Sequence, residues 1–197
     1  MNAWIRASTV GLVLAAMVGA SGCASTGPKQ DKPRKEKISQ KETVAFPSKV
    51  KFGEFKNVEI KPFGISEKCG RNAGNQKSAK VMDGMLQQDL RSVFPDLKVL
   101  PEGADFTKSA ERTLQIDPFI TDIRKVSTGT RVMLGVMAGG SHIIVRVTYR
   151  DSATGETIAD PEFVYKIDAW SDNWGAGGNQ LRDRLCSRIV DYSRDNK

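Results

Sequence analysis

The sequence contains one histidine and three cysteines, and these four residues lie far apart in the chain. A zinc site needs a cluster of such ligands, so we predict no metal site. No Ser or Cys nucleophile lies in a recognisable catalytic motif around the single histidine, His142. We therefore predict that His142 is structural or solvent-facing rather than a general base, that the chain is not an enzyme, and that it carries no cofactor.

Two loop-like stretches lack the residues that would make them binding loops. Gly135–Gly140 is rich in glycine, but it lacks the Lys-Ser/Thr pair of a P-loop and precedes a strand rather than a helix. Asp151–Glu156 lacks the alternating oxygen ligands of a calcium loop. We predict that the first does not cradle phosphate and that the second is a turn between strands.

The sequence also lacks a hydrophobic run long enough to cross a membrane as a stop-transfer helix. Its first apolar stretch, Val10–Ala20, follows the basic residue Arg6 and has the length of a secretory signal core. We predict a signal peptide over residues 1–22, so that the mature protein leaves the cytoplasm.

Small residues precede Cys23 in the sequence Ala20-Ser21-Gly22-Cys23. This arrangement resembles the bacterial lipobox, in which the cysteine is acylated and the signal is removed in front of it, although Ala20 stands where that motif usually has Leu. The alternative is an ordinary signal cleaved in the same region. Ala24 resembles the residue of lipoproteins that are forwarded to the outer membrane. We expect lipid attachment at Cys23 and an anchor in the outer membrane, facing the periplasm.

The positive charge is concentrated behind that cysteine. Residues 24–51 hold eight basic and three acidic side chains, whereas residues 52–197 hold 21 basic and 20 acidic ones. Because the later part is nearly neutral, the net charge of +7 does not indicate a nucleic-acid-binding domain. Residues 23–48 contain almost no bulky apolar side chain and predict a disordered tether. This tether either holds the chain against an anionic leaflet or, as we favour, is a soluble spacer.

Residues 49–197 predict a single periplasmic α/β domain of the α+β type. Alternating apolar residues predict strands at 56–63, 96–100, 112–123, 141–150 and near 163–167, the last of them interrupted near its start by Asp160-Pro161. Pro118 suggests an edge strand or a bulge. Apolar residues at steps of three and four predict helices at 76–94 and from Asn179 onward. The order β-α-β-β-β-β-α predicts one mixed, mostly antiparallel five-stranded sheet with two helices on one face.

Apart from Cys23, the cysteines are Cys69, in a predicted loop, and Cys186, in the last predicted helix. An even pair in an exported protein favours a disulfide between them, and this is our prediction. The alternative is a free Cys69 and a Cys186 that serves as a small core residue.

Two apolar features suit a partner-binding surface. Met133 and Met137 lie in an apolar stretch flanked by glycines, which forms either an adaptable contact surface or, as we favour, a buried crossover. Trp170 and Trp174 lie in a polar, glycine-rich loop, where they anchor a partner or cover the edge of the core.

Over residues 56–192 the chain resembles a group of uncharacterised bacterial lipoproteins known as a domain of unknown function. The resemblance rests on Arg131 with the Gly135–Gly140 loop, on the strand after it, on Asp151-x-x-Thr154-Gly155-Glu156 and on the Trp/Gly-rich loop. In strand order the chain is also similar to CsgG-like and TolB N-terminal-like periplasmic domains. This similarity implies an assembly or adaptor module at the cell envelope, without catalytic residues. The long pore-forming hairpins of CsgG are not evident, which argues against a channel.

These observations support three hypotheses. The first is an outer-membrane lipoprotein whose domain acts as an envelope adaptor or assembly factor and binds another envelope protein. The second is a tethered periplasmic ligand-binding protein or hydrolase, which requires a polar pocket near His142 or the Trp loop. The third is an oligomer joined through exposed strand edges or the Met-rich loop.

Overall fold

The computed structural model of the protein describes residues 45–108, 111–127, 130, 133–134, 139–167 and 177–197, which lie within the unit Glu36–Lys197. The predicted signal peptide, Cys23 and most of the tether lie outside the described residues. The described elements are, in chain order, η1 (Phe52–Glu54), β1 (Asn57–Ile60), β2 (Gly64–Ile65), α1 (Glu67–Gly70), α2 (Ala73–Leu90), β3 (Lys98–Val99), β4 (Thr113–Arg124), β5 (Ser141–Asp151), β6 (Thr157–Ala159), β7 (Glu162–Ile167) and α4 (Gly177–Asp195).

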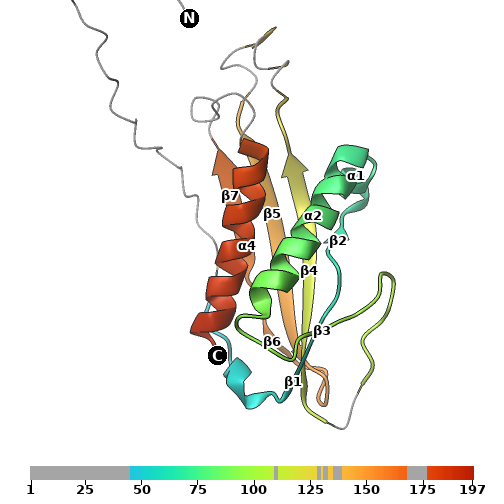
Figure 1. The fold of residues 1–197 in the computed structure, drawn as a ribbon, viewed down its shortest axis with the longest axis vertical. Coiled ribbons are helices and arrows are strands. Elements are labelled where there is room, and N and C mark those ends of the chain that lie inside the picture. Colours follow the sequence, from blue (N-terminus) through green and yellow to red (C-terminus); the bar gives the residue numbers. More distant parts are fainter. Residues whose placement is uncertain (1–44, 109–110, 128–129, 131–132, 135–138, 168–176) are drawn as a thin grey trace, which may run out of the picture. The chain divides into compact units, whose positions relative to one another are not determined.

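These strands form one mixed sheet with β4 and β5 at its centre (Figure 1). β4 pairs antiparallel with β5, and on its other side it pairs parallel first with β1 and then with β2. β3 lies outside β1, while β6 and β7 both pair antiparallel with β5. The predicted α+β class with a mixed sheet is therefore confirmed, although the sheet has seven strands rather than five.

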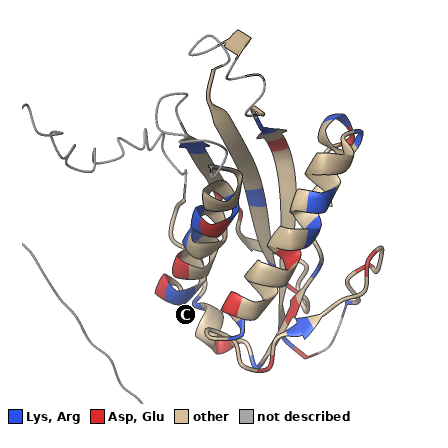
Figure 2. Ribbon diagram, turned by 45° about the horizontal axis from the view of Figure 1, so that its top comes forward, with Lys and Arg blue, Asp and Glu red and all other residues tan. Residues whose placement is uncertain are grey.

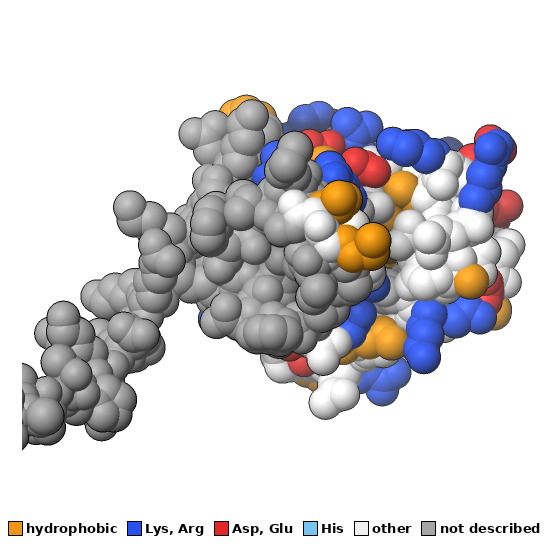
Figure 3. Space-filling view, turned by 90° about the horizontal axis from the view of Figure 1, so that it is seen from above, with side chains coloured by type: hydrophobic (Ala, Val, Ile, Leu, Met, Phe, Trp, Pro, Cys, Tyr) orange, Lys and Arg blue, Asp and Glu red, His pale blue; other side chains and the backbone are white. Residues whose placement is uncertain are grey.

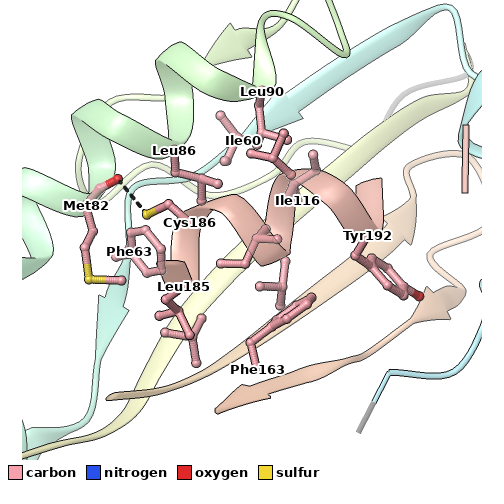
Figure 4. Close-up of a cluster of buried hydrophobic side chains, with 14 of the residues drawn as sticks. Ile60, Phe63, Met82, Leu86, Leu90, Ile116, Phe163, Leu185, Cys186 and Tyr192 are labelled. Carbon is pink, nitrogen blue, oxygen red and sulfur yellow. Dashed lines mark hydrogen bonds between the residues drawn. The ribbon is translucent and has the colours of Figure 1, made fainter. Parts of the chain in front are cut away.

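Both long helices lie on the same face of this sheet, as predicted (Figure 1). The alternation in β5 turns one row of side chains toward them, and all four of these side chains are completely buried: Ile143, Val145, Val147 and Tyr149. The predicted helical stripes meet this row from the other side (Figure 4), and their buried members include Met82, Leu86, Leu90, Leu181, Leu185 and Ile189. Each fully buried aliphatic side chain of this kind stabilises the fold by roughly 1.5–3 kcal/mol.

The chain enters the domain beside its own C-terminus. Phe52 stacks on Tyr149 with 4.7 Å between ring centroids, and its N–H donates to the carbonyl of Asn196 at 2.8 Å. The Tyr192 hydroxyl donates to the carbonyl of Phe46 at 2.8 Å. These bonds fix the point at which the predicted tether reaches the folded domain.

α2 begins three residues earlier than predicted because Asn72 caps it. The Asn72 side chain accepts hydrogen bonds from the N–H groups of Gly74 and Asn75, at the end of the helix where N–H groups lack the usual partner one turn earlier. The regular helix ends at Leu90, and tighter turns carry the chain through Val93 to Pro95.

Pro118 lies in the middle of β4, the central strand, so the predicted edge position is wrong. The parallel pairing with β1 ends at Ile116, and the pairing with β2 begins at Phe119. Proline has no N–H to donate, and it stands in the gap between these two partners, where the sheet requires no such donor.

The remaining differences concern short elements. The region 64–74, predicted as a loop, contains β2 and α1, which are too short to show a period in the sequence. The predicted fifth strand is divided at Asp160-Pro161 into β6 and β7, where the predicted interruption lies. Asp151–Glu156 forms the predicted turn, with Gly155 at a positive φ of 76°.

The predicted Cys69–Cys186 disulfide is contradicted, because both cysteines are free thiols. The two side chains face different neighbours. Cys69 donates toward Asp122 Oδ1 at 3.7 Å, whereas Cys186 lies between the helices with its sulfur 3.9 Å from the carbonyl oxygen of Met82 (Figure 4). Burial raises the pKa of the Cys186 thiol to about 12, as for a small core residue.

Within the described part of the chain, no helix has the length and apolar character needed to span a membrane. The same residues contain no group of three His, Cys, Asp or Glu side chains arranged to hold a metal ion.

Candidate functional site

The face of the sheet turned away from α2 and α4 is called here the open face. Neither of these helices covers it, and strand alternation brings polar and apolar side chains to it. Those contributed by β4, β5 and β7 are Asp117, Phe119, Asp122, Arg124, His142, Ile144, Arg146, Thr148, Arg150, Glu162, Val164 and Lys166.

Phe119 is the large apolar side chain at the centre of this face. It is 41% exposed, and its ring covers Gly64 of the neighbouring strand β2. On the opposite side, β5 places Arg146 directly across from it, while Ile144 pairs with Val164 of β7 one step along the same face. The apolar side chains of Phe119, Ile144 and Val164 therefore lie on the same face of three neighbouring strands, β4, β5 and β7, and we call them the apolar row.

Charged residues lie around this apolar row, and residues of opposite charge lie next to each other. Arg150 lies 3.9 Å from Asp117, and Arg146 lies 3.8 Å from Asp160. Figure 2 shows the same mixing over helices and strands, with basic and acidic residues interspersed rather than gathered by sign. Such exposed pairs contribute little stability. They do give the open face a balanced set of groups that can hydrogen-bond across an interface.

A β-bulge near the end of β4 reverses the side of the sheet to which the following side chains point. The register with β5 shifts between Ile120 and Asp122, which leaves Thr121 as the extra residue. The bulge brings Asp122 to the open face, where its Oδ2 lies 2.8 Å from Nε2 of His142. Without that shift Asp122 would point into the core.

Asp122 is the centre of a small network. Besides His142, it accepts from Cys69 and lies 3.8 Å from the Lys68 ammonium, so it links α1 to the sheet. The hydrogen bond from His142 is the largest of the influences that lower the pKa of the Asp122 carboxyl.

The order of these groups does not match a nucleophilic triad. In such a triad the imidazole lies between the nucleophile and the carboxylate. Here the carboxylate of Asp122 lies between the Cys69 thiol and the His142 imidazole, and Cys69 is only 3% exposed. This arrangement supports the structural interpretation of His142. The lack of enzymatic activity stays a prediction.

A polar cleft of about 400 Å³ lies farther along the sheet, between β1, β3 and the loop before β4. Its lining includes Glu59, Lys98 and Glu111, and Lys98 is paired with Glu59 at 2.8 Å. The ligand-binding hypothesis requires a pocket near His142 or the Trp loop, and this cleft is lined by neither.

The other predicted contact residues separate into two groups. Met133 is 85% exposed and its neighbour Leu134 is 56% exposed, so the favoured interpretation of a buried crossover is wrong at these two positions. Met137, Trp170 and Trp174 lie outside the described residues, as do Arg131 and Gly135, so their predicted roles stay predictions.

Phe119 was not among the predicted contact residues, although the sequence contains a signal for it. The inward positions of β4 are even-numbered up to Ile120, so an aromatic residue at position 119 points outward. The inward Ile123 breaks that parity, which reveals the bulge and places Asp122 on the same side as Phe119.

Comparisons with known proteins support the fold. No protein-family model and no curated protein matches the chain. The structure is similar to a dodecamer of a PelC variant from Paraburkholderia phytofirmans, with a TM-score of 0.53 and 10% identity over 77% of this chain and 98% of that one. A second PelC dodecamer from this organism has a TM-score of 0.48 with 12% identity, covering 78% of this chain and 95% of that one. A lipoprotein from Neisseria meningitidis has a TM-score of 0.37 with 11% identity, covering 68% and 98%.

At such identities the similarity to the PelC variant shows a common fold and nothing about activity. The expected similarity to CsgG-like and TolB N-terminal-like domains is not shown by these comparisons.

Proposed function

We propose that this protein is a lipid-anchored component of the bacterial cell envelope whose α+β domain is a non-catalytic assembly module that associates with copies of itself through the open face. The observation that carries this proposal is Phe119, which is 41% exposed between paired charges on the sheet face turned away from α2 and α4. An apolar centre with a polar rim is the usual composition of a protein interface.

Two further observations support it. The structure with which this chain shares its fold is described as a dodecamer, so this fold is compatible with homo-oligomers. The lipobox-like sequence that ends at Cys23 and the basic, apolar-poor segment behind it suit an anchored domain that is free to meet its neighbours in the plane of a membrane. In this proposal Ala24 directs the lipoprotein to the outer membrane.

The oligomeric state of the mature, detergent-extracted protein tests this proposal. Light scattering of the wild-type chain is expected to give an oligomer, and Phe119→Asp is expected to reduce it to a monomer because a carboxylate would be buried at the centre of the interface. Val81→Asp is the matched control, since Val81 is 40% exposed but lies on α2, on the helical side. It should leave the oligomer intact.

A wild-type protein that remains monomeric at the concentration of the native membrane would contradict self-association. If Val81→Asp dissociates an oligomer and Phe119→Asp does not, self-association stands but the interface lies on the helices.

A further inference from the structure

The second surface of interest lies on the helical side of the sheet, at the end where α2 and α4 both begin (Figure 1). Figure 3 views the molecule from this end. The two helices run side by side in the same direction, and Cys186 of α4 contacts the carbonyl of Met82 of α2. One turn closer to the start of each helix lie Ser78 and Arg182. The same end of the sheet receives Lys125, the residue that follows β4.

Lys125 is an exposed residue whose side chain reaches α2. Its ammonium donates to the hydroxyl of Ser78, which is 2% exposed and itself donates to the carbonyl of Gly74 at 3.0 Å. Removal from water lowers the pKa of Lys125, and the nearby positive charge of Arg182 lowers it further.

Arg182 has an unused donor in the same place. One of its terminal nitrogens, Nη2, donates to Asn179 Oδ1. Its Nε atom is buried and has no hydrogen-bond partner, and it is the one side-chain atom of this kind among the described residues. Buried polar atoms are nearly always paired, so an orphaned donor on a cation indicates a missing acceptor.

The two cations also have no acidic partner where the structure describes their surroundings. None of the ion pairs formed by residues 45–108, 111–127, 139–167 and 177–197 includes Lys125 or Arg182. Lys125 is exposed and Arg182 is half-buried, but the positive charge of Arg182 acts on Lys125, and a counter-charge bound beside both would relieve this repulsion.

We propose that Lys125 and Arg182 form a binding site for a phosphate-type oxyanion beside the second turns of α2 and α4, at Ser78 and Arg182. A tetrahedral anion offers several oxygens, so the guanidinium and the ammonium can each contact a different one. Both helices begin about one turn away, so the positive ends of their dipoles add at most a minor attraction for an anion. The free phosphate ion and the phosphodiester of an anionic lipid head group share this chemistry.

This site does not depend on self-association through the open face, because it lies in the opposite layer of the domain. It also differs from the predicted role of the basic tether, since that segment precedes the domain.

The experiment measures phosphate binding by the full chain carrying Cys23→Ser, which is purified without its lipid. Isothermal titration and thermal unfolding are followed in inorganic phosphate and in chloride at equal ionic strength. Phosphate is expected to bind and to raise Tm above its value in chloride. Lys125→Met and Arg182→Gln are each expected to weaken phosphate binding about tenfold or more, because each removes one charged hydrogen bond. Lys80→Gln, an exposed cation on α2, is the control and should bind as the wild type does.

Lys125→Met provides a second readout that a purely structural lysine would not give. It removes one of two like charges, so its Tm in chloride should equal or exceed that of the wild type, while the rise in Tm that phosphate causes is lost.

Titration with a short-chain phosphatidylglycerol below its micelle concentration distinguishes the two sources of the anion. A site for a lipid head group binds this lipid, which then competes with phosphate, whereas a site for the free ion does not bind it. Equal phosphate affinity in the wild type, Lys125→Met and Arg182→Gln would overturn the proposal, as would the absence of any effect beyond that of chloride.

Discussion

The ring of Phe119 occupies the space that a side chain at Gly64 would need. A Cβ atom added to Gly64 would lie 2.5 Å from Cδ2 of Phe119, which is closer than two carbon atoms approach without displacement. The two residues are direct partners in the parallel pairing of β2 with β4. Gly64 therefore leaves room for the Phe119 ring on the open face, where the proposed interface has its centre.

This contact predicts the effect of Gly64→Ala. The new methyl group must displace the Phe119 ring, so the free energy of unfolding should fall by about 1 kcal/mol. This is the low end of the cost of overpacking, because the ring is partly exposed and can move. In a Phe119→Ala background the clash is absent, and the same change should be neutral or stabilising because alanine restricts the unfolded chain. Chemical denaturation of the four proteins in this cycle measures the coupling.

Gly84→Ala is the matched control for that cycle. A Cβ at Gly84 meets nothing within 4 Å, and the residue lies on the exposed side of α2. Alanine should raise the stability there by up to about 1 kcal/mol. Additive effects of Gly64→Ala and Phe119→Ala would contradict the contact between them.

The elements that were predicted correctly are those with enough residues to show a period. The rows of β5 and the stripes of α2 and α4 each repeat over several turns or alternations, and burial follows them residue by residue. β2 has two residues and α1 has four, so neither is long enough to show a repeating pattern, and the sequence predicts a loop there. Pro118 indicates an edge strand or a bulge because its missing N–H is a property of the residue itself, whereas the gap that accommodates it in β4 lies between two other strands, β1 and β2.

The candidate sites were harder to predict because they depend on pairs that are distant in the chain. Asp122 and His142 meet only after a bulge reverses the side on which Asp122 emerges. Lys125 and Arg182 come from different layers, and neither lies in a motif. The disulfide prediction failed for the same reason: an even number of cysteines says nothing about whether their side chains face each other.

Both thiols should be measurable without reduction. In the Cys23→Ser chain, a thiol reagent should label Cys69 and Cys186 once the protein is unfolded in denaturant, because they are free. In the native state labelling should be slow, since both are buried and only the thiolate reacts, and burial raises the pKa of Cys186 to about 12. If neither thiol is labelled in denaturant until a reductant is added, the disulfide exists.

The Asp122–His142 pair predicts a specific response to acid. The pKa of Asp122 is below its usual value in the folded protein, mainly because His142 donates to it, while in the unfolded chain it titrates near ~3.9. Its contribution to stability is therefore present above about pH 4 and is lost as the pH falls through the lowered folded pKa. Asp122→Asn should reduce the free energy of unfolding at pH 7 by at most about 1 kcal/mol, because the side chain is partly exposed, and by less at lower pH.

Thermal unfolding from pH 2 to pH 7 measures this difference. Asp105→Asn is the control, because its side chain is 99% exposed and its pairing with Lys61 at 3.1 Å should contribute little. A difference between wild type and Asp122→Asn that is the same at every pH would show that the carboxylate charge does not stabilise the fold.

Asn72 gives α2 its start, and its loss should affect the end of the domain where the proposed anion site lies. Its side chain accepts from Gly74 N at 2.8 Å and from Asn75 N at 3.3 Å. Asn72→Ala leaves the Gly74 N–H without this partner, while Asn75 N–H keeps its bond to the backbone carbonyl of residue 72 at 2.9 Å, and the change should lower the free energy of unfolding by about 1 kcal/mol. Asn72→Asp keeps an acceptor and adds a favourable charge at the helix start, so it should be as stable as the wild type. Hydrogen exchange should then be faster in the first turn of α2 in Asn72→Ala and unchanged in α4. Equal stability of the Ala and Asp variants would mean that water replaces the cap at no cost.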